Sequence, residues 1–290
     1  MTTADGILAT TTPRDRQVWD FIRRNPTIVI GGTMLLLIAL GAVFAPWIAG
    51  DPIVFKPVNR LKPPSDEFLL GTDSLGRDVF ARTVYGARIS LLVGLSVAAG
   101  SIVAGLFFGL VCGYYRRIDA AVMRLLDGIM AIPAILLAIA LVSVMGSSVR
   151  VVIIAIIIPE IPRVTRLVRA VVLSVRELPY VDAARSSGAR ARKILLRHIL
   201  PSTVPPLIVQ ATYICASAIL TEAGLSFLGA GTPPEFPTWG NMIAQSRLYL
   251  ASAPWTIFAP GACLALVVLS VNLLGDGLRD HLDPRLARRM

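Results

Sequence analysis

Residues 180–201 read YVDAARSSGARARKILLRHILP, a short basic segment rich in alanine that lies between two long apolar stretches. Asp182 suits the first turn of a short helix, where a carboxylate interacts favourably with the positive end of the helix dipole. Ala183 and Ala184 favour helix and add almost no bulk, so a partner surface can approach them closely. Gly188 suits the turn that ends this helix. The segment therefore predicts a compact elbow with a tip of small residues.

The second half of the same segment predicts another helical piece, over residues 190–197. Pro201 fits the first turn of the apolar helix that follows, because the first N–H groups of a helix are unpaired in any case. The arginines of the segment favour the cytoplasmic side of a membrane. The alternative is an ordinary positively charged loop, which needs arginine but not this spacing of alanine and glycine.

The composition is that of an integral membrane protein. Of the 290 residues, 55% are hydrophobic and 16% are charged, whereas soluble domains carry about 25% charged residues. The net charge of +10 would indicate nucleic-acid binding in a soluble protein. Here the arginines cluster beside apolar stretches, so membrane topology explains them and we expect no nucleic-acid partner. Three scattered cysteines are too few for a disulfide framework or a metal site and are interpreted as small core residues; they are Cys112, Cys215 and Cys263.

Six apolar stretches predict six transmembrane helices in an all-α fold. The predicted spans are residues 26–49, 88–112, 121–145, 149–175, 202–229 and 254–274. With both termini inside, 20 of the 28 basic residues fall in inside segments. Because positive charge is enriched in cytoplasmic segments, this bias predicts that both termini are cytoplasmic.

The predicted organisation has four parts. They are a cytoplasmic tail (1–25), the first helix with an extracytoplasmic loop (26–87), a core of five helices (88–277) that contains a coupling loop (178–200), and a second cytoplasmic tail (278–290).

The chain reads FLLGTDSLGRDVFARTVYGARISLLVG over residues 68–94. We take six residues of this stretch as one loop motif: Gly71, Thr72, Asp73, Gly76, Arg77 and Asp78. The glycines allow a tight turn, and the three charged side chains are close enough to pair with one another. Local ordering of the loop is favoured over contact with substrate, since ion pairs in exposed loops are usually local.

Two acidic residues fall at membrane depth, where an ionisable group is by default a candidate functional site. Glu160 has Arg163 three residues on, and pairing between the two is the favoured interpretation. Ser217, Thr221 and Glu222 form a polar stripe at helical spacing in the fifth span. Glu222 either lines a substrate path or caps neighbouring backbone, and the sequence leaves both open. The candidate pathway or gate residues are therefore Glu160, Ser217, Thr221 and Glu222.

Three further features concern helix geometry. Gly105 and Gly109 have the GxxxG spacing that allows helices to approach closely, or they reflect chance in a glycine-rich chain. Arg124 and Asp127 are three apart and can pair on one helical face. Pro133 predicts a kink in the third span.

The elbow sequence, with Asp182-Ala183-Ala184, then Gly188, then residues 198–201, resembles the signature loop of ABC-importer permeases. Asp stands at position 182 in place of the family's usual Glu, and His stands at 198. The loop motif, residues 225–229 and a closing motif resemble the C-type subunit of the dipeptide, oligopeptide and nickel branch. The closing motif comprises Asp276, Arg279, Asp280, Asp283 and Pro284.

The resemblance implies a type I ABC-importer permease fold and an ATPase-docking loop. The docking residues that it implies are Tyr180, Asp182, Ala183, Ala184, Ser187, Gly188, Arg192 and His198. It also implies the surroundings of the chain: a bacterial plasma membrane and its lipid, a homologous permease subunit in a heterodimer, one fused or two separate ABC ATPases, and an extracytoplasmic binding protein. The chain would form half of the pathway for di- or oligopeptides, moved by alternating access.

The sequence contains no G-x-x-x-x-G-K-[ST] loop and no H-E-x-x-H motif. We therefore expect no catalytic residue, cofactor or metal in this chain, with ATP and Mg²⁺ bound by the partner ATPases. Three alternatives remain: import of nickel chelates by the same mechanism, a proton-coupled secondary transporter that uses Glu160 or Glu222, and a passive channel. The cargo stays open.

Overall fold

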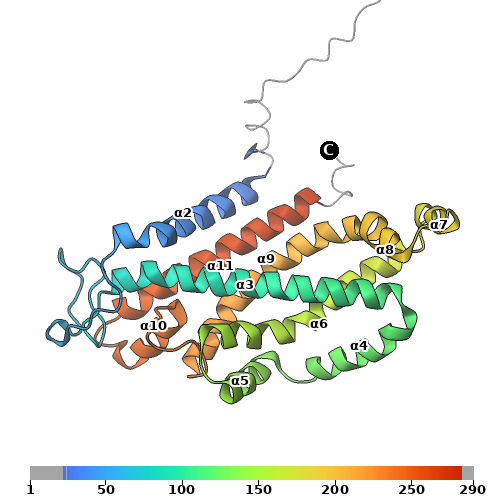
Figure 1. The fold of residues 1–290 in the computed structure, drawn as a ribbon. Coiled ribbons are helices and arrows are strands. Elements are labelled where there is room, and N and C mark those ends of the chain that lie inside the picture. The colour runs from blue at the N-terminus through green and yellow to red at the C-terminus, as the bar shows by residue number, and fades with distance from the viewer. Residues whose placement is uncertain (1–21, 24, 283–290) are drawn as a thin grey trace, which may run out of the picture.

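The computed structural model describes residues 22–23 and 25–282, and helices dominate this part of the chain. The long helices run side by side, and short helices join them at both ends (Figure 1). Helices α7 (Pro179–Ser186) and α8 (Ala191–Ile194) lie at one end, which we call the elbow end. The connection before α3 and helix α10 (Trp239–Ser246) lie at the opposite end, the loop end. Almost all of the predicted first tail, and residues 283–290 with two residues of the closing motif, lie outside the described residues.

The helix bounds are as follows. The long helices are α2 (Pro26–Ile48), α3 (Val79–Tyr114), α6 (Val149–Val175), α9 (Leu200–Phe227) and α11 (Trp255–Leu282). The other short helices are α4 (Arg116–Met130) and α5 (Ala134–Met145), and single turns of 3₁₀-helix lie at Pro57–Asn59 and Arg247–Tyr249. A π-helical turn, Leu195–Ile199, joins α8 to α9, so one helical segment runs from Ala191 to Phe227.

Three of the predicted spans have nearly the observed bounds: α2, α6 and α9. The sixth predicted span ends at Leu274, but α11 continues to Leu282. The second predicted span begins at Arg88, but α3 begins at Val79 because Asp78 caps it and accepts a hydrogen bond from the Phe80 N–H (2.9 Å). The first turns of this helix contain polar residues, so hydropathy alone did not predict that the helix begins before Arg88.

The predicted third span is broken rather than gently kinked at Pro133, and whether it crosses the membrane as one span stays a prediction. The region forms two helices, α4 and α5, whose axes differ by 87°. Pro133 has an extended backbone, with ψ of 129°, and proline also disfavours helical geometry in the residue before it. The predicted pair between Arg124 and Asp127 is also replaced, because Asp127 Oδ1 accepts a hydrogen bond from Arg166 Nη2 of α6 at 2.5 Å.

Among the described residues, four helical segments are long and apolar enough to cross a membrane: Pro26–Ile48, Val79–Tyr114, Ala191–Phe227 and Trp255–Leu282. The bent pair of α4 and α5 gives a fifth if it counts as one span. Helix α6 has the predicted bounds but carries five charged residues: Arg150, Glu160, Arg163, Arg166 and Arg169. The chain is thus a multi-pass membrane protein, and the number of six crossings stays a prediction.

The most extensive contact between two long helices is between α3 and α6, where glycines spaced four apart face valines spaced four apart. The residues are Gly105, Gly109 and Gly113 of α3 against Val164, Val168 and Val172 of α6. A Cβ atom added at any of these glycines would lie 2.4 to 2.5 Å from the Cβ of the facing valine. The GxxxG spacing is therefore used for close helix packing inside this chain.

We predict that Gly109→Ala destabilises the protein by about 1–3 kcal/mol, because the added methyl overpacks the contact with Val168. Gly128→Ala is the matched control, since no atom lies within 4 Å of the Cβ it would add. Thermal unfolding of the two variants in the same detergent measures the difference. Equal unfolding temperatures would contradict the importance of this contact.

Candidate functional site: the elbow and the polar sites of the helices

The elbow, residues 178–199, connects α6 to α9 and carries α7 farthest out at the elbow end (Figure 1). Helix α7 begins at Pro179, has Asp182 in its first turn, and ends at a turn made by Gly188. Gly188 has a φ of +77°. Its N–H donates to the Arg185 carbonyl, and the N–H of the next residue donates to the Ala184 carbonyl, both at 3.0 Å. These two bonds form a Schellman motif, which fixes the direction in which the chain leaves α7.

Buried side chains anchor the elbow to the long helices. Val181, Ile194 and Ile199 have at most 1% of their surface exposed and belong to the main hydrophobic core. The Tyr180 hydroxyl donates to the His198 carbonyl at 3.3 Å, which links the two halves of the elbow. The elbow is therefore an amphipathic structure with one face held by the core and the other face free.

The free face contains a hollow of about 430 Å³ between α7 and the start of α8. It is lined by Ala184, Ser187, Gly188, Ala189, Arg190, Lys193 and His198. Four of the predicted docking residues thus surround one concave surface. The other four, Tyr180, Asp182, Ala183 and Arg192, are exposed beside it.

Three details of this face were not expected. The Asp182 carboxylate pairs with Arg185 at 3.0 Å. The sequence reading also missed Arg190 and Lys193 as lining residues. Both residues are basic and lie in the same segment, which was the only signal in the sequence that they belong to the docking face. The direction in which each side chain points depends on the turn at Gly188, which the sequence does not define.

Glu160 is buried in α6, and both its oxygens accept hydrogen bonds from Arg163 Nη1 at 3.0 Å. The predicted pair is confirmed. The Arg163 guanidinium also lies 5.8 Å from the ring centroid of Tyr213 on α9. The pair therefore sits where α6 faces α9, and its role in a pathway stays a prediction.

The predicted polar stripe on α9 divides into two environments. Ser217 and Thr221 are half-buried, and the Thr221 hydroxyl donates to the Ser217 carbonyl at 2.8 Å. Glu222 is 1% exposed and faces the loop end. The structure does not place these three residues on one continuous polar surface, and their role as gate residues stays a prediction.

Glu222 holds the loop that follows α9. Its Oε1 atom accepts hydrogen bonds from the hydroxyls of Ser226 (2.8 Å), Thr238 (3.0 Å) and Thr232 (3.1 Å). The sequence left open whether Glu222 lines a substrate path or caps neighbouring backbone. The observed contacts resemble capping, but Glu222 accepts from side-chain hydroxyls and not from backbone N–H groups.

The loop motif folds into a compact turn. Gly71 and Gly76 have φ values of 68° and 72°, and Arg77 Nε donates to Asp73 Oδ2 at 2.7 Å, which confirms that pair. Asp78 does not join it, because its carboxylate caps α3. Partial burial raises the pKa of the Asp78 carboxyl, although its backbone hydrogen bonds oppose this effect.

Distant residues complete this network. Arg77 Nη2 donates to Gln245 Oε1 of α10 at 2.7 Å, and buried Arg82 places its Nε 3.7 Å from Asp73 Oδ2. The Thr72 carbonyl accepts from Trp255 Nε1 of α11 at 3.2 Å. No local pattern pointed to Gln245 or Trp255, because more than 160 residues separate them from the motif.

Within residues 22–23 and 25–282, no group of three His, Cys, Asp or Glu side chains is arranged to hold a metal ion.

Comparison with known proteins identifies the family. Residues 101–288 match the binding-protein-dependent transport system inner membrane component, and residues 14–64 match the N-terminal TM domain of oligopeptide transport permease C. The chain is 61% identical to a probable peptide ABC transporter permease protein of Sinorhizobium fredii, over 92% of each chain. It is 43% identical to a dipeptide transport system permease protein of Alkalihalophilus pseudofirmus, over 93% of this chain and 90% of the relative.

The fold has a solved counterpart. A chain of the MetNI methionine ABC transporter, in an inward-facing conformation, superimposes with a TM-score of 0.58 at 19% identity, over 70% of this chain and 97% of that chain. The all-α, type I ABC-importer permease fold expected from the sequence is thus confirmed. With the match over residues 101–288, these findings show that the chain belongs to the binding-protein-dependent transport system inner membrane component family.

Proposed function

We propose that this chain is one of two permease subunits of an ATP-driven importer for di- or oligopeptides that a binding protein delivers. The observation that carries the proposal is the elbow, which combines a core-anchored base with a concave outer face. The names of the relatives support peptide as cargo. The chain itself contributes no ATP-binding motif, and ATP and Mg²⁺ belong to the partner ATPases.

The elbow is built to transmit force. Its two helices are joined by the Schellman turn at Gly188 and by the bond from Tyr180 to the His198 carbonyl. The segment Ala191–Phe227 is continuous, so a displacement of the elbow moves α9 as a rod. The same elbow is attached to α6 through residues 175–178. Motion at the elbow end therefore reaches both helices that carry the buried acids, Glu160 and Glu222.

The proposed orientation places the elbow end in the cytoplasm. Nine basic residues lie between Arg163 and Arg197, and positive charge is enriched on that side. Both termini would then be cytoplasmic and the loop end would face the binding protein, in a bacterial plasma membrane.

Exposed apolar surface supports a second permease subunit and lipid as neighbours. Helix α5 leaves Leu136, Val144 and Met145 exposed, with 86% of Val144 accessible. Exposed apolar side chains of this kind are expected where a helix contacts lipid or a protein partner. A homologous subunit packed against part of this surface would complete the pathway.

Two alternatives differ in cargo or energy source. Nickel chelates would use the same elbow and the same ATPases. A proton-coupled transporter would use Glu160 or Glu222 as a relay, but Arg163 neutralises the first, and three hydroxyls enclose one oxygen of the second.

The docking role of the hollow gives the first test. Ala184→Trp should fill the hollow and lower ATP-dependent peptide uptake by at least about tenfold, because losing even ~1.4 kcal/mol of docking energy weakens binding tenfold. Uptake by proteoliposomes and co-purification of the ATPase measure the effect.

Ala251→Trp is the matched control for that experiment, since Ala251 is an exposed alanine at the loop end. It should leave co-purification of the ATPase unchanged, because it lies at the end opposite to the elbow, and both variants should unfold at the wild-type temperature. Normal uptake and normal ATPase co-purification by Ala184→Trp would contradict docking in the hollow.

The energy source gives the second test. Peptide uptake into proteoliposomes should continue when a protonophore collapses the proton gradient, and should stop when vanadate inhibits the ATPase. Glu160→Gln and Glu222→Gln should both retain ATP dependence. Uptake that ends with the proton gradient would instead support the secondary transporter.

A further inference from the structure

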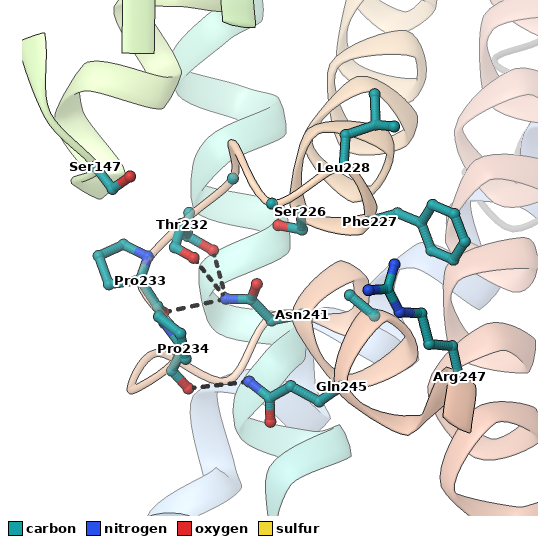
Figure 2. A pocket seen from close by; sticks show the side chains of 13 residues that line it. Ser147, Ser226, Phe227, Leu228, Thr232, Pro233, Pro234, Asn241, Gln245 and Arg247 are labelled. Atoms are coloured by element: carbon teal, nitrogen blue, oxygen red, sulfur yellow. Dashed lines mark hydrogen bonds between the residues drawn. The ribbon is translucent and has the colours of Figure 1, made fainter. Parts of the chain in front are cut away.

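A second hollow, of about 370 Å³, lies at the loop end, and we call it the loop-end pocket (Figure 2). Four segments form it: the turn between α5 and α6, with Ser147; the end of α9, with Phe227; the loop after α9, with Pro233 and Pro234; and α10, with Asn241. The volume lies within the range of about 300–1,000 Å³ that small-ligand sites occupy. It is separate from the elbow hollow at the opposite end.

Hydrogen bonds hold the walls of this pocket in place. Asn241 Nδ2 donates to the Thr232 carbonyl and hydroxyl at 2.9 Å and to the Pro233 carbonyl at 3.1 Å. Figure 2 shows these bonds, together with the bond from Gln245 to the Pro234 carbonyl. Behind the wall, Thr232 also donates to Glu222. These bonds order the wall formed by α10 and the loop after α9 before any ligand binds, which lowers the entropy cost of binding.

Charge gives the pocket a polarity. Arg247 is its only charged lining residue, and among the described residues no acidic side chain pairs with it. Arg247 is exposed, and its guanidinium lies 5.8 Å from the ring centroid of Phe227, a second lining residue, within the range of a cation–π contact. The carbonyls of Pro233 and Pro234 lie on another wall, and the carboxylate of Glu222 lies behind them. One part of the pocket thus attracts an anion and another attracts a cation or an N–H donor.

From this arrangement we infer that the loop-end pocket binds the free carboxylate end of a short peptide, with Arg247 as the anion-binding group and the proline carbonyls facing the amino end. The inference rests on the proposed peptide cargo. It adds a recognition site on the membrane subunit itself, at the end where cargo would enter.

The test measures ligand protection in the assembled complex in nanodiscs. Ser147→Cys places a thiol in the pocket wall, and a charged maleimide labels it; the parent chain, with its three native cysteines, gives the background. Trialanine should slow the labelling. Trialanine amide should need about tenfold higher concentration, because a hydrogen bond to a charged group is worth roughly 1.5–3 kcal/mol.

Further substitutions, each combined with Ser147→Cys, connect this effect to one side chain. With Arg247→Gln, trialanine and its amide should protect the thiol equally weakly. With Arg247→Lys, trialanine should still protect somewhat better than its amide. Arg150→Gln, which removes an arginine close to Ser147 in sequence but outside the pocket lining, should keep all of it. Equal protection by both peptides when Arg247 is present, absence of protection, or a difference that survives Arg247→Gln would overturn the inference.

Labelling requires neither ATP nor the binding protein, so it is independent of transport. Import of trialanine by the reconstituted parent complex tests the proposed cargo separately. Protection without import would contradict peptide import but support the pocket, and import without protection would do the reverse.

Discussion

The close contact between α3 and α6 is the constraint on which the other helices depend. Helices in lipid gain little from hydrophobic association, so intimate packing has to supply the attraction. Helix α3 packs closely against several neighbours because it has glycine on several faces. Besides the ridge against α6, Gly94 lies against Ile219 of α9, and Gly86 lies against Trp239 of α10. A single helix without bulk on these faces is thus the centre around which α6, α9 and α10 are arranged.

This centre explains how a charged helix is accommodated. Helix α6 carries five charged residues, yet its packing against α3 buries much of it, and four of the five form ion pairs. Arg166 and Arg169 bind Asp127 and Asp119 of α4, and Arg163 binds Glu160 within α6. The amphipathic helix α4 therefore supplies acidic groups to α6, before the chain bends by 87° into α5.

Sequence reasoning was most successful where the signal is local. Hydropathy located the long helices, and the spacing of alanine and glycine located the elbow, because both depend on neighbouring residues. The pairs Asp73–Arg77 and Glu160–Arg163 were predictable for the same reason. The contacts of Gln245 and Trp255 were not, since they join segments that only the tertiary fold brings together, and the contacts of Glu222 with Thr232 and Thr238 depend on the path of the loop after α9. Pro133 predicted a bend, but not that the two helices differ in direction by 87°.

The π-helical turn at Leu195–Ile199 sets the rotational phase between the elbow and α9. In an α-helix each residue advances the direction of side chains by about 100°, so a turn that accommodates one extra residue offsets everything before it by that angle relative to everything after. The direction in which the elbow hollow faces around the α9 axis therefore depends on these five residues. Of the five, only His198 lines the hollow. Insertion or deletion of one residue there would turn the hollow toward a different neighbour and would also displace Ile199, which anchors the elbow in the core.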